Sequence, residues 1–257
     1  MALVTFENHS EQIGILSFSD PDRLNAMGEA MSEEFAAKVS ELSADPNMRV
    51  LILSGAGRAF SAGGDLDMLK SKRDLAGEEN RRRMLTYYSN FLSVRDLGIP
   101  IIAAINGHAI GASLCLACAC DIRIAASGAK LGFTFTRLGL HPGMGATYFI
   151  ERATNASVAS DLLLTARIIQ AEEALTLGLI SRVVETEKVR DEAIGIAQEI
   201  LQGGPESVQQ LLQSIRAERR SCAEALQREA AMQAVNYASA EFLEGVSAAL
   251  EKRKASF

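Results

Sequence analysis

One stretch, residues 100–148, constrains the fold more than any other part of the sequence. It predicts a buried strand, a glycine turn, a short helix, a second strand and a loop rich in Gly and Pro. The helix, residues 112–120, contains only Ala, Ser, Cys and Leu and carries almost no bulk. Such a helix suits a central position where other backbone or a ligand comes close. Its first N–H groups have no partners within the helix, so they can hold an anion or a carbonyl that is becoming one.

The composition is that of a large soluble domain. The chain has 257 residues, of which 48% are apolar and 23% charged, and it can bury a substantial core. No apolar run approaches the roughly 20 residues of a membrane span, and no signal peptide is evident, so we expect no membrane partner and a cytoplasmic location. The net charge of -6 argues against non-specific nucleic-acid binding. The same net charge is compatible with a local basic pocket for an anionic ligand.

Three cysteines, Cys115, Cys118 and Cys120, crowd the small-residue helix. Their spacing invites a metal interpretation, but no His or acidic cluster completes it and the neighbours are Leu and Ala. Free Cys is among the most buried residue types. We therefore expect buried apolar side chains here and no metal site.

Ahead of this stretch, the sequence alternates strands and helices. Residues 3–7 and 13–18 predict a hairpin, and apolar residues at helical spacing predict a helix over residues 27–43. Residues 49–54 (RVLILS) predict a strand covered on both faces. A glycine loop at residues 55–64 then opens into a helix at Asp65.

Two polar or helical regions complete the chain. Residues 70–83 predict an exposed connection that leads into a helix over residues 79–97, and its triplet Arg81-Arg82-Arg83 either faces phosphates or forms a solvated helix start. Beyond the central stretch, helices and short strands are expected at residues 156–164, 167–170, 171–177 and 178–184. From residue 186 onward the pattern is helical, with a break at residues 203–205 and many apolar positions that require burial against the core or another subunit.

The chemistry is expected where a glycine loop feeds a helix. Gly63-Gly64-Asp65 and Gly111-Ala112-Ser113 each follow an apolar strand and offer N–H groups unobstructed by bulky side chains. If the two strands are neighbours, the helix starts converge. Two N–H groups aimed at one oxygen form an oxyanion hole, and losing one donor typically costs about 3 to 4 kcal/mol of transition-state stabilisation. The alternative is that these glycines only end strands or allow tight packing.

Several ordered motifs resemble the enoyl-CoA hydratase/isomerase (crotonase) family. In chain order they are Arg23-Leu24-Asn25-Ala26, Arg58-Ala59-Phe60-Ser61-Ala62-Gly63-Gly64-Asp65-Leu66, Pro100-Ile101-Ile102-Ala103-Ala104-Ile105-Asn106-Gly107, Asp121-Ile122-Arg123, Leu138-Gly139-Leu140-His141-Pro142-Gly143, and the run from Leu164 to Ile180. The resemblance spans roughly residues 3 to 200.

The resemblance implies an α/β fold, a spiral of repeated ββα units. It divides the chain into a core with an acyl-CoA site, residues 1–200, and a C-terminal helical region for oligomerisation, residues 201–257. The implied assembly is a homotrimer or homohexamer. Coenzyme A is expected as part of a thioester substrate, and no separate cofactor is expected.

The site residues carried over from the family centre on the same two loops. The oxyanion-hole N–H groups fall on Gly64 and Ala112, beside Gly111. Arg23 matches a position whose basic side chain often meets coenzyme A phosphates, although an ordinary surface Arg is an alternative. The adenine and pantetheine path falls on segments containing Asn25, Ala26, Ala62, Asp65 and Leu66.

The sequence departs from the family at both acid-base positions. Hydratases of the family use two glutamates, because adding water across a double bond needs a base for the water and an acid for the α-carbon. Here the two positions fall on Cys115 and Phe135. General acid-base groups are each worth roughly 10² to 10⁴ in rate. The sequence thus predicts a poor hydratase by the usual route.

Other side chains could stand in for the glutamates. Cys115 lies in the first turns of the small-residue helix, where the dipole lowers a thiol's pKa. His141 is the best titratable candidate by residue type, with a structural His bonded to loop backbone as the alternative. His108 is expected to line the pocket or donate one hydrogen bond. Arg137, Thr134 and Thr136 could bind a carboxylate on the acyl group.

Three hypotheses follow. The chain is an enoyl-CoA hydratase with substituted acid-base groups, or it catalyses another acyl-CoA reaction through an enolate, such as isomerisation, decarboxylation or hydrolysis. The third is a non-catalytic acyl-CoA binder or structural subunit. All three predict binding of a coenzyme A thioester.

Overall fold

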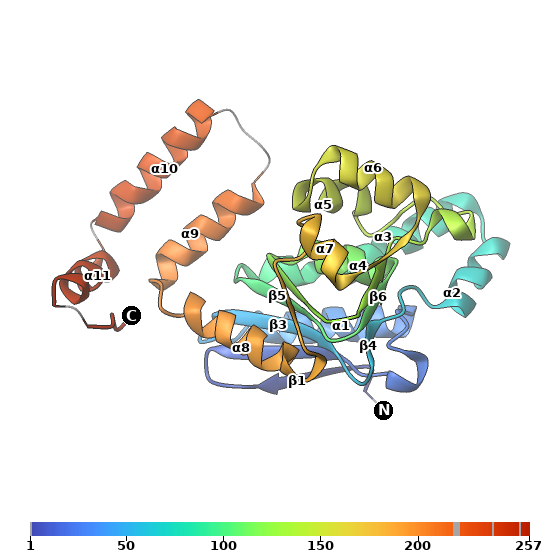
Figure 1. Ribbon diagram of the computed structural model, residues 1–257, viewed down its shortest axis with the longest axis horizontal. Helices are drawn as coiled ribbons and strands as arrows, with labels where there is room; N and C mark the ends of the chain where they lie inside the picture. Colours follow the sequence, from blue (N-terminus) through green and yellow to red (C-terminus); the bar gives the residue numbers. More distant parts are fainter. Residues whose placement is uncertain (1, 218–221, 238, 252) are drawn as a thin grey trace.

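The computed structural model describes residues 2–217, 222–237, 239–251 and 253–257. Its strands form two sheets (Figure 1). The larger sheet has the order β1-β2-β3-β5-β7-β10, and the smaller has the order β4-β6-β8-β9. The strands are β1 Val4–Asn8, β2 Ile13–Phe18, β3 Val50–Gly55, β4 Ala59–Ser61, β5 Ile101–Ile105, β6 His108–Ile110, β7 Ile122–Ala126, β8 Lys130–Gly132, β9 Ile168–Gln170 and β10 Arg182–Val184.

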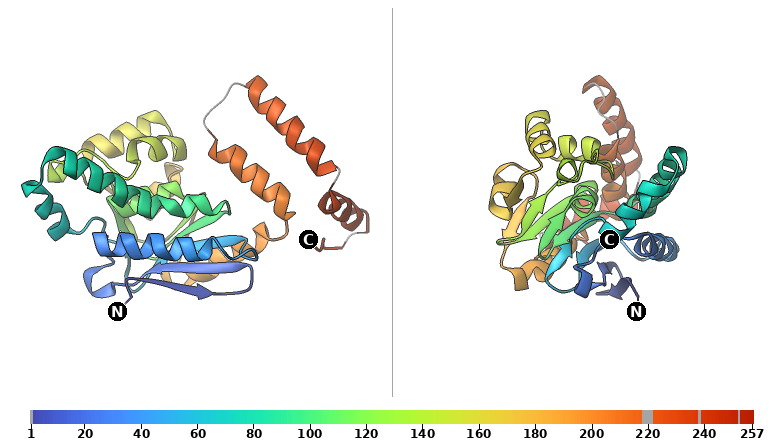
Figure 2. Two further views of the ribbon diagram at one scale, coloured as in Figure 1. Left: turned by 180° about the vertical axis from the view of Figure 1, so that it is seen from behind. Right: turned by 90° about the vertical axis from the view of Figure 1, so that its right-hand side faces the viewer.

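Helices cover both sheets and extend beyond them (Figures 1 and 2). The α-helices are α1 Glu29–Leu42, α2 Leu66–Ser71, α3 Gly77–Leu92, α4 Ala112–Ala119, α5 Ala146–Ala153, α6 Ala156–Thr165, α7 Ala171–Thr176, α8 Val189–Ile200, α9 Pro205–Arg216, α10 Cys222–Tyr237 and α11 Ala240–Glu251. Short 3-10 helices lie at η1 Pro21–Arg23, η2 Lys72–Asp74, η3 Ser93–Leu97, η4 Thr136–Leu138 and η5 Thr186–Lys188.

The chain winds as a spiral in which each turn gives one strand to each sheet. β3, β5 and β7 pair in parallel in the larger sheet, and β4, β6 and β8, which follow them in the chain, pair in parallel in the smaller one. Among the described strands, the antiparallel pairs are β1 with β2 and β8 with β9. The repeated strand–strand–helix order confirms the expected spiral of ββα units. Because of this spiral, equivalent strands of successive ββα units lie side by side in the same sheet.

α4 is the centre of this spiral. All eight of its residues are buried, and α5 packs against it. The helix has no polar face because it meets protein on every side, which explains its uniformly small and apolar composition. The expectation of a central small-residue helix is confirmed. Cys115, Cys118 and Cys120 are buried there as free thiols.

The structure corrects several boundaries. The glycine loop at residues 55–64 contains strand β4, and the predicted helix over residues 79–97 is α3 followed by η3. The connection expected at residues 70–83 is largely helical. Strands of three residues and helices that begin inside Gly-rich segments, such as β6 and α5, give no periodic signal long enough to recognise.

The Arg triplet belongs to the solvated face of α3. Arg81 pairs with Glu78, and both Arg82 and Arg83 pair with Glu79. Hydrogen bonds from Arg82 and Arg83 lower the pKa of Glu79 to about 2. The triplet is thus occupied by neighbouring carboxylates on its own helix.

The C-terminal helices α9, α10 and α11 form an arm that leads away from the two sheets (Figures 1 and 2). An ion pair joins the C-terminal end of α9 to the core. Arg216 bonds Asp121 at 2.6 and 2.9 Å, and the two side chains are each 13% exposed. The same guanidinium donates to the carbonyl oxygens of Arg95 and Ile99. Within the described part of the chain, no helix combines the length and hydropathy needed to cross a membrane.

Candidate active site

The two glycine loops meet backbone to backbone. β4 and β6 pair in the smaller sheet, so the segments that follow them run side by side. A Cβ placed on Gly63 would lie 2.2 Å from the carbonyl oxygen of Ile110 and 3.6 Å from the nitrogen of Ala112. Any side chain at Gly63 would therefore push the two loops apart. The starts of α2 and α4 converge, as expected if their strands are neighbours.

Buried hydroxyl groups hold the two loops together. The Ser113 hydroxyl donates to the carbonyl oxygen of Ser61 at 2.9 Å and accepts from the Ile110 N–H at 3.0 Å. The Ser61 hydroxyl donates to the carbonyl oxygen of Asn25 and accepts from the Gly63 N–H. Both serines are fully buried. Sequence reasoning missed them, because small hydroxyl residues in a glycine loop give no signal for a contact across the fold.

Gly64 and Ala112 present free N–H groups to a common space. Gly111, which precedes Ala112, has φ 57° and ψ -121°, a conformation that in practice only glycine adopts. Among the described residues, we find no acceptor for the N–H of Gly64 or of Ala112. Both residues line one cavity.

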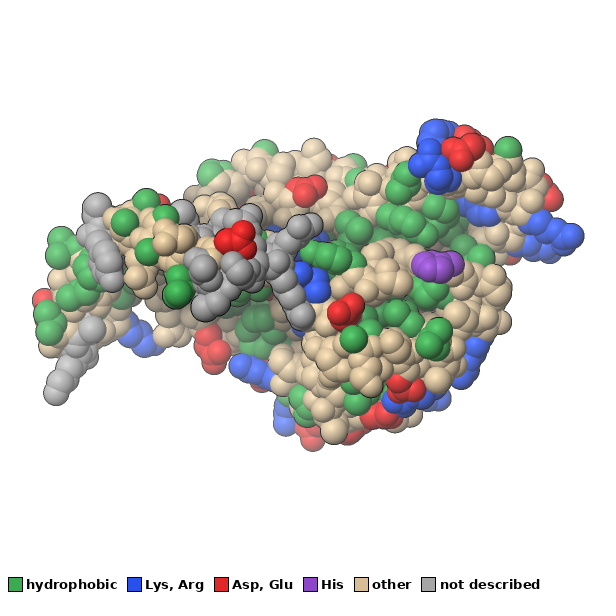
Figure 3. Space-filling model, turned by 90° about the horizontal axis from the view of Figure 1, so that it is seen from above, with side chains coloured by type: hydrophobic (Ala, Val, Ile, Leu, Met, Phe, Trp, Pro, Cys, Tyr) green, Lys and Arg blue, Asp and Glu red, His purple; other side chains and the backbone are tan. Residues whose placement is uncertain are grey.

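This cavity has a volume of about 740 Å³, within the usual range of about 300 to 1,000 Å³ for small-ligand sites. Its lining is mainly apolar, from Met68, Leu69, Met84, Phe135 and Met144. Seen from above, hydrophobic side chains gather in a hollow on this face, with a histidine beside them (Figure 3). An apolar wall around two N–H donors strengthens their interaction with a bound oxygen.

Most of the residues carried over from the family resemblance lie around the cavity. Those that line it are Arg23, Ala26, Ala62, Gly64, Asp65, Leu66, Gly111, Ala112, Phe135 and His141. Cys115, Asn25 and His108 are not among the lining residues. Thr134 also lines the cavity, whereas Arg137 and Thr136 do not.

Asn25 is buried and shapes the loop. Its amide donates to the carbonyl oxygens of Ala56 and Ala59 at 2.9 Å each, and its side-chain oxygen accepts from the Asp20 N–H. With these partners filled, the side chain contributes to the loop's conformation and does not reach a ligand. His108, in contrast, is exposed, and its Nδ1 accepts a hydrogen bond from the Lys130 N–H at 3.0 Å.

Two carboxylates, Asp65 and Asp67, are among the described residues that line the cavity, both at the start of α2. Asp65 pairs with Arg23 and accepts from the Met68 N–H as the cap of α2. Asp67 is exposed. Neither occupies one of the two positions that the family resemblance assigns to glutamates.

Comparison with known proteins identifies the fold and the family. The family model for enoyl-CoA hydratase/isomerase matches residues 8–257. This chain belongs to that family. A crotonyl-CoA hydratase from Syntrophomonas wolfei is 34% identical, over 96% of this chain and 95% of its own.

Solved structures of the enoyl-CoA hydratase/isomerase family confirm the crotonase fold. The crystal structure of an enoyl-CoA hydratase from Bacillus anthracis matches with a TM-score of 0.92 at 32% identity, over 99% of this chain and 98% of that chain. An enoyl-CoA hydratase from Polaromonas matches with a TM-score of 0.91 at 28% identity, over 98% of each chain.

The positions that the family resemblance assigns to glutamates have different environments here. Cys115 has no exposed surface, and burial raises the pKa of its thiol well above the ordinary value. The expectation that the helix dipole lowers this pKa is wrong, because desolvation in the all-apolar surroundings of α4 outweighs the dipole. Phe135 lines the cavity and lies close to Gly111. It makes the site drier.

His141 lines the cavity at its exposed edge. Its Nδ1 lies 2.8 Å from the carbonyl oxygen of Pro142, the loop-backbone bond that a structural histidine would make. His141 thus fits both interpretations given above, a titratable group at the acyl pocket and a structural histidine of the loop.

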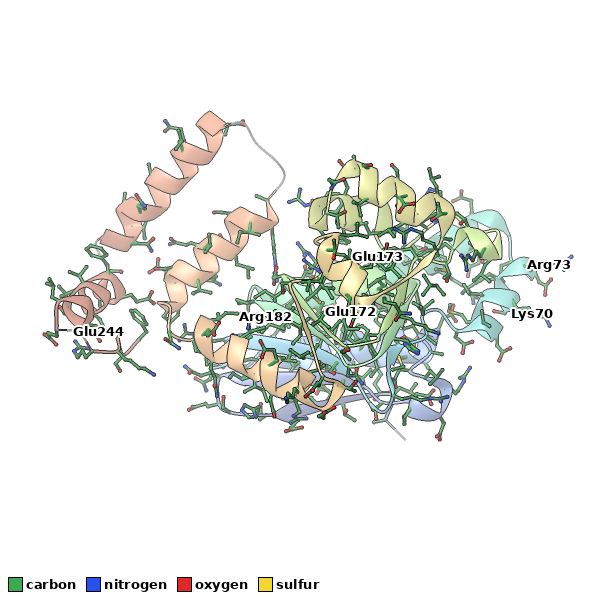
Figure 4. All side chains as sticks on the ribbon, in the orientation of Figure 1. Lys70, Arg73, Glu172, Glu173, Arg182 and Glu244 are labelled. Atoms are coloured by element: carbon green, nitrogen blue, oxygen red, sulfur yellow. The ribbon has the colours of Figure 1, made fainter. Side chains whose placement is uncertain are left out.

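Two basic side chains, Arg23 and Lys72, are among the residues that line the cavity. Arg23 is 56% exposed and pairs with Asp65, and Lys72 pairs with Glu29. Lys70 and Arg73 project outward at the far end of α2 and η2, whereas Glu244 lies on the C-terminal arm (Figure 4). The exposed Arg23 guanidinium is the cation at the cavity that a negatively charged ligand tail would meet first.

Two adjacent tyrosines on α3 were missed by sequence reasoning. Tyr87 donates to the carbonyl oxygen of Met27 at 2.8 Å, and Met27 in turn bonds Gly63 and Asp65 through its backbone. Tyr87 therefore supports the loop that carries Gly64. Tyr88 lines the cavity. Both come from a polar segment that gave no indication of contact with the glycine loops.

Proposed function

We propose that this protein binds an acyl-CoA thioester and stabilises the enolate formed from it. The thioester carbonyl oxygen lies between the N–H groups of Gly64 and Ala112, and negative charge develops on that oxygen during reaction. Each such donor is worth about 10² to 10³ in kcat. Coenzyme A enters as part of the substrate, with its phosphates near Arg23.

One observation carries the proposal: two N–H groups without acceptors among the described residues face one apolar cavity at the meeting point of two glycine loops. Unsatisfied backbone donors in a dry site require a partner, because each costs free energy when left unpaired. An oxygen that becomes negatively charged meets that requirement best.

Hydration of a 2-enoyl-CoA is the reaction we propose first, by relation to the named hydratases. In that reaction water adds to the β-carbon, and the α-carbon receives a proton. The apolar lining favours short or medium acyl chains without charges. The family's usual acid-base pair is absent, with Cys115 and Phe135 at the two positions.

That absence favours a second candidate, another reaction through the same enolate. Decarboxylation forms the enolate by loss of CO₂, with neither a water molecule to activate nor a proton to abstract, so a site without the family's two glutamates can still support it. Thr134 lines the cavity, and its hydroxyl can orient a polar acyl substituent.

The test removes one donor and leaves the fold intact. Ala112 is the first residue of α4, where proline is compatible with the helix and replaces the N–H by a ring carbon. Ala112→Pro should lower kcat for crotonyl-CoA hydration, or for decarboxylation of a malonyl-type thioester, by about 10² to 10³. Ala156→Pro, at the first residue of α6, is the matched control and should leave both rates unchanged.

The outcomes separate the hypotheses. An Ala112→Pro enzyme with native kcat contradicts the oxyanion hole. Calorimetry that detects no binding of crotonyl-CoA to the native chain contradicts the acyl-CoA site altogether. Binding with no turnover of either substrate supports the non-catalytic binder.

We further propose that the C-terminal arm assembles the chain into a homotrimer or homohexamer. The arm exposes large apolar side chains, with Leu211 at 60%, Leu243 at 68% and Leu250 at 80%. Apolar surface of this kind is typical of a subunit interface. Sedimentation at micromolar concentration tests the assembly, and a monomer would contradict it.

A further inference from the structure

Tyr88 brings a hydroxyl group to the cavity that Ala112 and Phe135 also line. A Cβ on Gly143 would lie 2.3 Å from the Tyr88 Oη, so the ring reaches the loop that follows Phe135 and His141. Its helix, α3, also contacts α4, which carries Cys115. Tyr88 therefore comes from an element next to α4 and shares the cavity with Phe135, one of the two positions without a glutamate.

The local sequence fixes this position. Asn80, Met84, Tyr87 and Tyr88 lie at helical spacing on α3 and all line the cavity. The Tyr88 ring packs edge-on against Tyr87 with centroids 6.0 Å apart, and the glycine at 143 leaves room for the hydroxyl. These neighbours hold the Tyr88 ring in place, and a different rotamer of the side chain would lose this packing.

The hydroxyl is available for chemistry. Tyr87 next to it uses its own hydroxyl to bond Met27, but we find no hydrogen-bond partner for the Tyr88 hydroxyl among the described residues. Burial raises the pKa of Tyr88, with a smaller contribution from Cys115. The group is consequently a neutral phenol at physiological pH, able to donate its proton.

We propose that Tyr88 is the catalytic residue that exchanges a proton with the substrate α-carbon. The proposal rests on the proposed function, because it requires the enolate held by Gly64 and Ala112. It replaces the missing carboxylic acid by a phenol that comes from α3 instead of α4 or the following loop.

The step balances in both directions. As the enolate collapses, the electron pair of its carbon–carbon double bond forms the new C–H bond, the Tyr88 O–H bond breaks, and the thioester carbonyl is restored. In hydration, the water that adds to the β-carbon loses one proton, which restores the phenol. In the reverse direction the phenol gives its proton to the β-hydroxyl group of the substrate, and the resulting phenolate accepts the α-proton as the enolate forms and water leaves.

The experiment compares native protein with Tyr88→Phe, which deletes only the hydroxyl. Two rates are measured: hydration of crotonyl-CoA by absorbance, and exchange of the α-protons of 3-hydroxybutyryl-CoA with deuterated water by NMR. Calorimetry gives the dissociation constant of each thioester. Tyr148→Phe is the matched control, since Tyr148 is exposed on α5 and lies outside the cavity.

We expect native protein to exchange the α-protons and Tyr88→Phe to do so about 10² to 10⁴ times more slowly. Its dissociation constants and unfolding temperature should stay native, and Tyr148→Phe should match native protein in every measurement. The split between an altered rate and unaltered binding is what a merely structural tyrosine would not give.

A native rate in Tyr88→Phe would overturn the role of Tyr88 while leaving the proposed function in place. Native protein that binds both thioesters yet neither hydrates nor exchanges them would contradict both the role of Tyr88 and the enolate chemistry, and would leave only the non-catalytic binder. Failure of the native protein to bind either thioester instead defeats the proposed function, and the proton-transfer role with it.

Discussion

Gly63 is the point where the two loops of the site touch, and Gly63→Ala is the sharpest perturbation of that contact. Its φ is +89°, a conformation that side-chain-bearing residues rarely adopt. The added methyl group would lie 2.2 Å from the Ile110 carbonyl oxygen, which is backbone and cannot rotate away. The loops must therefore separate.

Two costs add in this variant. Holding alanine in a sparsely populated backbone region costs about 1 to 3 kcal/mol, and forcing extra volume into a packed site costs about 1 to 3 kcal/mol. We expect the free energy of unfolding to fall by about 2 to 6 kcal/mol in sum. Because Gly64 follows Gly63 directly, its N–H should no longer point at the substrate carbonyl oxygen. We therefore expect kcat to fall about 10²-fold or more.

Denaturant unfolding and steady-state kinetics measure the two effects. Gly77→Ala is the matched control, because a Cβ at Gly77 meets nothing within 4 Å and the residue begins α3. Its stability should be unchanged or slightly higher, by up to about 1 kcal/mol. If Gly63→Ala unfolds at the native denaturant concentration with native kcat, the backbone contact that positions Gly64 and Ala112 is refuted.

Four further predictions concern the surroundings of the site and the arm. Ser113→Ala should lower stability by about 1 to 3 kcal/mol, because the Ser61 and Ile110 backbone groups lose a buried partner, and urea unfolding measures this. Arg216→Met should cost up to about 3 to 5 kcal/mol by leaving the mostly covered Asp121 carboxylate without its guanidinium partner. Cys115 should resist alkylation in the native state up to alkaline pH, since its raised pKa keeps the thiol protonated, and mass spectrometry should find it alkylated only after unfolding. Leu243→Glu with Leu250→Glu should reduce the sedimenting mass without altering far-ultraviolet circular dichroism.

Each of these has a result that would count against it. If Ser113→Ala or Arg216→Met unfolds at the native urea midpoint, the hydrogen bonds of that residue do not stabilise the fold. Rapid alkylation of Cys115 in the folded chain would mean that α4 is not closed to solvent. An unchanged sedimenting mass in the double leucine variant would place the subunit interface elsewhere.

The sequence predicted the core of the spiral well because its signals are local. The apolar runs of β3 and β5 and the small-residue composition of α4 each imply burial on every side, whatever the rest of the chain does. The same two glycine loops predicted where the site lies. When β4 and β6 are neighbours in one sheet, the turns that follow them lie next to each other.

What the sequence did not indicate depends on contacts across the fold. Asn25 and His108 stood in or beside family motifs, yet their polar atoms are bonded to Ala56, Ala59 and Lys130. The pKa of Cys115 was assigned the wrong direction because position on a helix is visible in sequence and desolvation is not. Tyr88 lies far from the motifs in the chain, and only packing of α3 on the spiral brings it to the cavity.

The central claim is that Gly64 and Ala112 polarise a thioester carbonyl, and vibrational spectroscopy of that bond tests it most directly. Isotope-edited Raman or infrared spectra of crotonyl-CoA labelled with ¹³C at the carbonyl should show the stretching frequency lowered on binding to native protein, because hydrogen bonds to the oxygen weaken the double bond. The shift should shrink in Ala112→Pro and stay native in Ala156→Pro. A bound carbonyl with the same frequency as in water or higher, or one unaffected by Ala112→Pro, would contradict the claim.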